Sequence, residues 1–307
     1  MLIKRPDFLK PGDTIGIAAT ARWIEQAHVD RAIELFHRYG WNVKLADNVF
    51  EHHFQLAGNA ERRRSCFQKM LDDSELSAII VGRGGYGTVE ILDSLDWGNW
   101  LNKPSWICGY SDVTALLCEC YSHGVSSIHS TMPVSFHDAT EIALEQLCQA
   151  LSGSLDHVEW KTSMHGSANI VAPLVGGNLS VLYSLLGSSS YPKGPAILFL
   201  EDVDEMVYHI HRMTTGLLRA GALDHIKAIV LGGFSKMRDN TIACGFPSDN
   251  PWGQTSLEAI VDITRRLNIP VIDGLPAGHL SDNRAFYHGQ MVRLEVEKGR
   301  AQLTWGV

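Results

Sequence analysis

Residues 105–122, SWICGYSDVTALLCECYS, join a short apolar run to a longer one through a glycine, a tyrosine and a serine. The first run has the length of a buried strand, and the second is long enough for a helix. A serine at such a corner is the arrangement of a nucleophile elbow, although Val113 stands where the usual GxSxG pattern has its last glycine. Ser111 is therefore a candidate nucleophile. The alternative is that it only caps the following helix, as serine often does.

The same order of strand and helix recurs on both sides of this corner. Amphipathic stretches lie between the apolar runs, as in residues 28–39, where Val29, Ala32 and Phe36 share one helical face. This alternation predicts an α/β fold built on a parallel sheet with helices on both faces. The apolar runs lie at 14–19, 42–46, 78–82, 105–109 and 126–129.

A change in composition divides the chain in two. Residues 152–168 are polar and rich in glycine and serine, which favours a linker. We therefore expect an N-terminal α/β domain over residues 1–151 that carries Ser111. A C-terminal domain of mixed α/β structure is expected over residues 169–307, where strand-like runs, helix-like runs and a final hairpin pattern follow one another.

The composition excludes several classes of protein. Of the 307 residues 45% are hydrophobic and the net charge is −8, which suits a globular protein and not a nucleic-acid binder. The basic run Arg62-Arg63-Arg64 fits a solvated helix face. No apolar stretch reaches the ~18 residues of a membrane span and there is no secretory signal core, so we expect a cytoplasmic protein without a membrane partner. The six cysteines have no CxxC spacing, which predicts reduced thiols.

A glycine-rich turn follows the third apolar run. Gly82, Gly84 and Gly87 match GxGxxG between a strand and a helix. A dinucleotide site places this pattern in the first strand–helix unit, with an acidic residue at the end of the next strand; here the next strand ends at Cys108 and Gly109. We therefore favour either a tight turn or a turn that brings backbone N–H groups close to a reacting oxygen.

Two further candidates follow strand-like runs in the second half. The apolar run at 196–200 leads into Glu201, a carboxylate that needs a partner if it is buried, either a histidine or the start of the next helix. His279 lies in a loop rich in glycine and proline, where a histidine is well placed to act as a base. His209 and His211 would face different sides of a helix, so we expect no metal site.

Ser111, Glu201 and His279 supply the three residue types of a serine hydrolase triad, each at a strand end. A weak hydroxyl nucleophile needs an adjacent base, and the base needs a third group that fixes its tautomer. The order of the three along the chain does not decide the matter, because the constellation recurs in different orders on different folds. Together they favour acyl transfer more strongly than any one does alone.

Seven blocks of sequence carry a resemblance that covers nearly the whole chain. They are LKPGDTIGIAA at 9–19, RGGYGTVEILDSLD at 83–96, GYSDVTALL at 109–117, GGNLSVLYSLLGS at 176–188, ILFLEDVDEMVYHIHRM at 197–213, IVLGGF at 229–234 and LPAGH at 275–279. In order and spacing these blocks resemble the LD-carboxypeptidase family of serine peptidases, which includes murein tetrapeptide carboxypeptidases and microcin C self-immunity proteins.

The resemblance implies a flavodoxin-like or glutaminase-like N-terminal domain, a smaller C-terminal domain and a homodimer. It implies Ser111 as the nucleophile, Glu201 as the acid and His279 as the base. It also implies that the backbone N–H groups of Gly85 and Asp112 form the oxyanion hole. The implied activity is release of the terminal D-alanine of murein tetrapeptide in the cytoplasmic recycling of cell-wall fragments, with no metal or cofactor.

A carboxypeptidase must also bind the free carboxylate of its substrate. Arg83, beside the glycine turn, is the first candidate because arginine forms bidentate pairs with carboxylates, and Tyr86 in the turn is the second. Three other functions remain open for this pattern of residues. They are an immunity-type peptidase or amidase with the same triad, a non-catalytic peptide-binding module, and a dinucleotide-dependent oxidoreductase.

Overall fold

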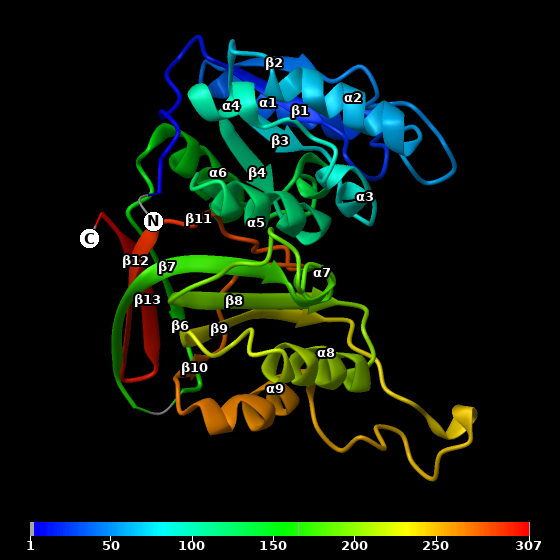
Figure 1. Ribbon diagram of the computed structural model, residues 1–307, viewed down its shortest axis with the longest axis vertical. Helices are drawn as coiled ribbons and strands as arrows, with labels where there is room; N and C mark the ends of the chain where they lie inside the picture. The colour runs from blue at the N-terminus through cyan, green and yellow to red at the C-terminus, as the bar shows by residue number, and fades with distance from the viewer. Residues whose placement is uncertain (1–2, 165, 307) are drawn as a thin grey trace. The chain divides into compact units, whose positions relative to one another are not determined.

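The computed structural model describes residues 3–164 and 166–306, and the chain forms two compact units (Figure 1). The first unit comprises Met1–Asp156 and Ser281–Gln290, and the second comprises His157–Leu280 and Met291–Val307. The chain therefore enters the second unit, returns briefly to the first, and ends in the second. Among the described residues, none of the helices combines the length and the apolar composition of a membrane span.

The first unit contains one sheet and its helices. Its strands are β1 (Thr14–Ala18), β2 (Asn42–Leu45), β3 (Leu76–Val81), β4 (Trp106–Gly109), β5 (Ser127–His129) and β11 (Phe286–His288). Its helices are α1 (Gln26–Arg38), α2 (Ala60–Leu71), α3 (Thr88–Leu92), α4 (Gly98–Asn102), α5 (Thr114–Ser122) and α6 (Glu141–Ser152), with 3-10 turns η1 (Ser111–Val113) and η2 (Pro133–Ser135). The strand order is β11-β5-β4-β3-β1-β2, and only β11 runs antiparallel to its neighbour.

The central strands of this sheet are apolar along their length because both faces are covered. All four residues of β4 are buried, and Ile15 and Ile79 on β1 and β3 have no exposed surface. Helix α1 buries one face, which includes Val29 and Phe36. The predicted α/β class with a parallel N-terminal sheet is confirmed.

The second unit contains a mixed sheet of seven strands. Its strands are β6 (His157–Lys161), β7 (Ala168–Asn178), β8 (Ala196–Val203), β9 (Ile226–Ser235), β10 (Val271–Ile272), β12 (Met291–Glu297) and β13 (Arg300–Trp305). Its helices are α7 (Leu179–Ser184), α8 (Val207–Arg219) and α9 (Ser256–Thr264), with 3-10 turns η3 (Ile242–Cys244) and η4 (Arg265–Leu267). The strand order is β10-β9-β8-β7-β12-β13-β6.

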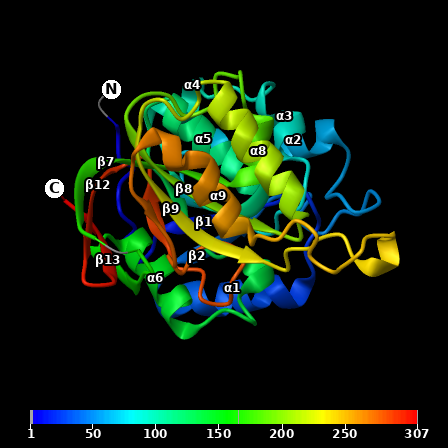
Figure 2. The same ribbon diagram turned by 90° about the horizontal axis from the view of Figure 1, so that it is seen from below.

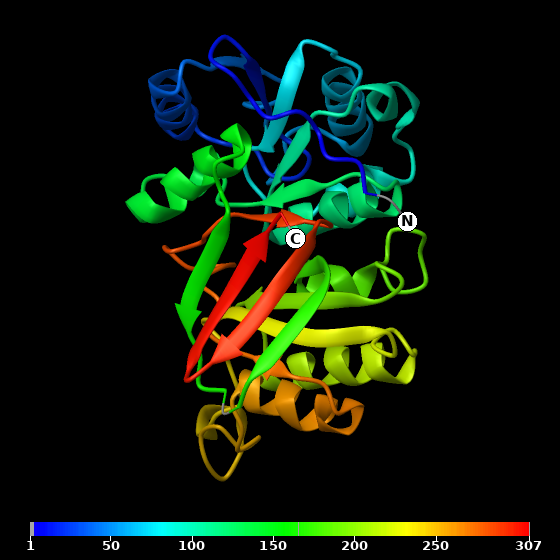
Figure 3. The same cartoon turned by 90° about the vertical axis from the view of Figure 1, so that its left-hand side faces the viewer.

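This sheet is parallel in one half and antiparallel in the other. Strands β7 to β10 run parallel, and helices α8 and α9 lie side by side along them (Figure 2). Strands β6, β13, β12 and β7 form the antiparallel half (Figure 3). Alternate residues of β12 are buried, as in a strand with one solvated face. Strands β12 and β13 form the hairpin that the period-two pattern predicts.

Two segments differ from the domain division expected from sequence. Within residues 152–168, strand β6 pairs with β13, and residue 165 lies outside the described residues. The alternating burial of β6 is that of an ordinary strand, so polar composition alone is a poor sign of a linker there. Ser281–Gln290 belongs to the first unit, where β11 pairs with β5.

Candidate active site

The serine corner begins where β4 ends. Gly109 has φ +154° and Ser111 has φ +62°, a left-handed value that strains a residue with a side chain. A Cβ at position 109 would lie 2.9 Å from the Val113 side chain, so the corner requires glycine there. The N-cap residues of η1 and α5 are Tyr110 and Val113, and neither cap uses a side-chain hydrogen bond. Ser111 therefore sits on a strained strand-to-helix corner and is not a helix cap.

The glycine-rich turn between β3 and α3 packs against this serine. A Cβ at position 84 would lie 3.3 Å from the Ser111 Cβ and 3.4 Å from its Oγ, so any side chain there would fill the space beside the hydroxyl. Gly85 and Gly87 have φ values of +117° and +144°, which glycine adopts without strain. The turn thus brings main chain next to the hydroxyl, which favours the reacting-oxygen interpretation of the GxGxxG pattern over a dinucleotide site.

The side chain of Asp112 ties the serine corner to the start of α3. Its Oδ2 accepts hydrogen bonds from the Thr88 backbone N at 3.1 Å and from Thr88 Oγ1 at 2.6 Å. Thr20 Oγ1 lies 2.7 Å from Thr88 Oγ1 and extends the network to the end of β1. Burial raises the pKa of Asp112, although the bonds from Thr88 act in the opposite direction. The two backbone segments that hold the predicted oxyanion donors are therefore fixed to each other.

Arg63 supports the same turn from below the surface. It is 1% exposed, and its guanidinium donates to the carbonyl of Gly87 at 2.7 Å and to that of Thr20 at 2.8 Å. Its other end forms an ion pair with Glu90. The sequence expectation of a solvated face for Arg62-Arg63-Arg64 is wrong for this middle residue. The helical spacing from Arg63 to the buried Phe67 is the signal that would have found it.

Glu201 and His279 meet in the second unit. Glu201 is fully buried on β8, and its Oε2 accepts from His279 Nδ1 at 2.7 Å and from the His279 backbone N at 3.1 Å. Gly278 has φ +102°, and a Cβ there would lie 2.6 Å from Oε2, so glycine allows the loop to approach. The Ser235 hydroxyl donates to the His279 carbonyl at 3.0 Å and holds the loop from the other side.

This contact sets the tautomer and the charge of the imidazole. With Nδ1–H donated to the carboxylate, Nε2 is left as the acceptor in the neutral ring. Burial acts to lower the pKa of His279, but the charge and hydrogen bond of Glu201 outweigh it, and the pKa is raised above 6.5. Neighbouring Asp202 is also buried, and burial together with the charge of Glu201 raises its pKa to about 7.

Arg83 and Tyr86, the two predicted substrate-binding residues, both lie in the glycine turn between β3 and α3. Arg83 Nη1 donates to the Trp23 carbonyl at 3.4 Å, and its guanidinium carbon lies 5.9 Å from the centre of the Trp23 ring. Tyr86 is 59% exposed. Its aromatic side chain is accessible beside the turn that contacts Ser111.

The structure therefore divides the predicted site residues between its two units. Ser111, Asp112 and Gly85 belong to the first unit, as do the two substrate-binding candidates. Glu201 and His279 belong to the second unit, where they are joined by a hydrogen bond. Sequence reasoning missed Thr88 and Arg63, which fix the serine corner and the glycine turn.

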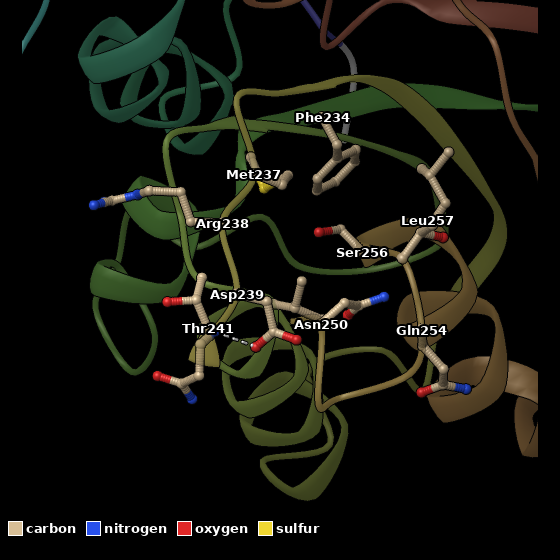
Figure 4. A pocket seen from close by; sticks show the side chains of 12 residues that line it. Phe234, Met237, Arg238, Asp239, Thr241, Asn250, Gln254, Ser256 and Leu257 are labelled. Atoms are coloured by element: carbon tan, nitrogen blue, oxygen red, sulfur yellow. Dashed lines mark hydrogen bonds between the residues drawn. The ribbon is translucent and has the colours of Figure 1, made fainter. Parts of the chain in front are cut away.

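A separate cavity of about 520 Å³ lies within the second unit, at the end of β9 (Figure 4). Phe234, Met237 and Leu257 give it an apolar part, and the buried Ser256 hydroxyl points into it. None of the predicted catalytic residues lines it. Among the described residues, no cluster of three or more His, Cys, Asp or Glu side chains suited to a metal ion is found.

Comparison with known proteins gives consistent matches over both units. The LD-carboxypeptidase N-terminal domain matches residues 15–130, and the LD-carboxypeptidase C-terminal domain matches residues 171–294. The murein tetrapeptide carboxypeptidase of Pseudomonas aeruginosa is 28% identical, over 93% of this chain and 94% of the relative. The microcin C7 self-immunity protein of Escherichia coli is 24% identical, over 96% of this chain and 94% of the relative. The crystal structure of muramoyltetrapeptide carboxypeptidase from Oxalobacter formigenes is similar, with a TM-score of 0.84 and 27% sequence identity. The match covers 94% of this chain and 97% of that structure's chain.

Proposed function

Because the chain belongs to the LD-carboxypeptidase family, we propose that it hydrolyses an L,D-peptide bond and releases the terminal D-alanine of murein tetrapeptide. The family is one of serine peptidases. The substrate is inferred from relatives that are named as murein tetrapeptide or muramoyltetrapeptide carboxypeptidases. The observation that carries the proposal is the 2.7 Å contact between His279 Nδ1 and Glu201 Oε2. It holds the imidazole in the tautomer that a general base needs.

In the acylation step, His279 Nε2 removes the proton of Ser111 as its Oγ attacks the scissile carbonyl carbon. Glu201 stabilises the imidazolium that forms. The carbonyl oxygen becomes an oxyanion, which accepts hydrogen bonds from the backbone N–H groups of Gly85 and Asp112. Support comes from the contact of the glycine turn with Ser111 and from the bonds between Asp112 and Thr88. One such donor is worth roughly 3 kcal/mol of transition-state stabilisation in other serine hydrolases.

The intermediate then collapses in the usual order for a serine hydrolase. The imidazolium of His279 gives its proton to the leaving amine, the C–N bond breaks, and free D-alanine departs. Water, deprotonated by the same imidazole, attacks the remaining Ser111 ester. The acyl–oxygen bond breaks, the proton returns to Ser111, and the shortened peptide is released.

Release of D-alanine from purified murein tetrapeptide tests this function directly. The wild-type protein should release one D-alanine per peptide, and Ser111→Ala should lose that turnover while its thermal melting stays near wild type. Turnover in Ser111→Ala at the wild-type rate would exclude Ser111 as the nucleophile. Binding of the peptide by the wild-type protein without any release would favour the non-catalytic binding module.

The microcin C7 self-immunity relative supports a second candidate, an immunity-type peptidase or amidase with the same three residues. The two functions differ in the group that follows the scissile bond. A panel of murein tetrapeptide against peptidyl-adenylate analogues distinguishes them, because the preferred substrate has the higher kcat/KM.

We also propose a cytoplasmic homodimer that acts in the recycling of cell-wall fragments. This rests on the family resemblance and on the murein substrates in the names of its relatives. Sedimentation equilibrium tests the assembly: a dimer would have twice the 33.9 kDa mass of the chain. A species of single-chain mass at micromolar concentration would contradict it.

A further inference from the structure

Two arginines approach the glycine turn beside Ser111. Arg22 packs on Gly85 so closely that a Cβ at position 85 would lie 2.7 Å from its Nε and 2.8 Å from its Cδ. Arg83 precedes the turn and contacts Trp23, the residue after Arg22. Both arginines are partly buried. Burial lowers the pKa of Arg83, and the positive charge of Arg22 lowers it further, whereas the charge of Glu25 acts in the opposite direction. The two guanidinium groups are therefore close enough to repel each other.

Neither guanidinium has a carboxylate partner within residues 3–164 and 166–306. Several other arginines of this unit are paired, as Arg62 is with Glu51 and Arg64 with Glu61. Arg22 Nε is buried and has no hydrogen-bond partner in the described structure. Among the residues that the structure describes, Glu25 is the one carboxylate whose charge acts on Arg83, and it forms no ion pair with it. Two partly desolvated like charges that lack a paired carboxylate cost free energy, and a bound anion lowers that cost.

Arg22 lies as close to the proposed oxyanion donors as a terminal carboxylate lies to the scissile carbonyl. Only three bonds separate the scissile carbonyl carbon from the carboxylate carbon, so the two lie at most about 3.7 Å apart. A receptor for the carboxylate must therefore adjoin the oxyanion donors. Arg22 meets this condition because it contacts Gly85, one of the proposed donors.

From these observations we propose that Arg22 and Arg83 together bind the free C-terminal carboxylate of the substrate. The inference rests on the proposed carboxypeptidase function and extends it, since it assigns the preference for a terminal residue to two side chains. Arginine suits this task because its planar fork donates two parallel hydrogen bonds to a carboxylate. Gly85 is required as glycine both for its φ and for the space that Arg22 fills.

The test compares two substrates that differ only at the C-terminus: murein tetrapeptide, and the same peptide with a D-alanine carboxamide. Arg22→Gln and Arg83→Gln should each lower kcat/KM for the free acid by roughly 10- to 100-fold, the value of a charge-assisted hydrogen bond. The rate for the carboxamide should change less than about threefold, because it offers no carboxylate. Arg31→Gln is the matched control, since it removes a positive charge from a surface pair on α1.

The outcomes separate this inference from the function on which it rests. Loss of the preference for the acid in both glutamine variants, with wild-type melting temperatures, supports the carboxylate site. Equal losses on acid and carboxamide, or an unchanged preference, overturn it while D-alanine release by the wild type upholds the function. Arg22→Lys covers the case in which Arg22→Gln fails to fold, and it should retain part of the preference through its charge. A wild type that releases nothing from the free acid overturns both proposals.

Discussion

Replacing Glu201 with glutamine removes the charge beside His279 and keeps the shape of the side chain. The two partners are 2.7 Å apart, which places the centres of a carboxylate and an imidazolium about 4 Å apart. At an effective dielectric constant of about 20, that charge pair is worth about 4 kcal/mol. In the active enzyme, whose base is neutral, the imidazolium forms only on proton transfer from Ser111. The loss therefore falls on the transition state, and kcat should decrease about 10³-fold.

The same substitution changes the pH dependence in a defined direction. In the wild type Glu201 raises the pKa of His279 above 6.5, and a base acts only when neutral. The kcat/KM of the wild type should therefore rise with pH, with its midpoint above 6.5. Without the charge of Glu201, burial dominates and lowers the pKa of His279, so the midpoint of Glu201→Gln should lie below that of the wild type.

The assay is D-alanine release from murein tetrapeptide between pH 5 and 9. Glu119→Gln is the matched control, because Glu119 is also a carboxylate beside a histidine, His123, at 3.1 Å. The control should keep the wild-type rate and midpoint. If Glu201→Gln retained kcat within about threefold of the wild type, with the same midpoint, the assigned role of this carboxylate would be refuted.

Two further substitutions probe the first unit. Gly84→Ala places a methyl group 3.4 Å from Ser111 Oγ and should lower kcat/KM at least about tenfold. Gly98→Ala is the control, because Gly98 is another glycine without a left-handed φ, and it should keep the wild-type kcat/KM. Equal activities of the two variants would argue against crowding of the hydroxyl. Thr88→Val deletes the 2.6 Å hydrogen bond to the buried Asp112 and should lower the free energy of unfolding by about 1–3 kcal/mol in urea denaturation. Thr88→Ser keeps the hydroxyl and should restore this free energy. An unchanged urea midpoint in Thr88→Val would show that the hydrogen bond contributes nothing to stability.

The sequence predicted well those features that repeat over many residues. Helix α1, Gln26–Arg38, covers all but the last residue of the stretch 28–39 that its periodicity marks, and the final hairpin follows its alternating pattern. The strained corner at Ser111 was also predictable, because a glycine and a serine between an apolar strand and a helix are the pattern of a nucleophile elbow, and glycine permits the sharp turn.

Features that depend on distant parts of the chain were not predictable in this way. Strand β11 has only three residues, Phe286–His288, and its place beside β5 is fixed by pairing across a long stretch of chain. Arg63 is buried because carbonyl groups of three separate loops accept hydrogen bonds from its guanidinium. The pattern of charges along one helix gives no information about those loops. The hydrogen bond from Thr88 to Asp112 likewise joins two turns that are far apart in the sequence, and no local pattern in either turn indicates the contact.

The central claim is that Ser111 and His279 act as one catalytic unit, and a double-mutant comparison of D-alanine release measures this most directly. Residues that act together lose their function together, so removing the second adds little to the loss from the first. If the two residues act as one unit, Ser111→Ala/His279→Ala should be no more than about threefold slower than the slower single variant, and both single variants should be far slower than the wild type. Losses that multiply, or a single variant that keeps the wild-type rate, would contradict it.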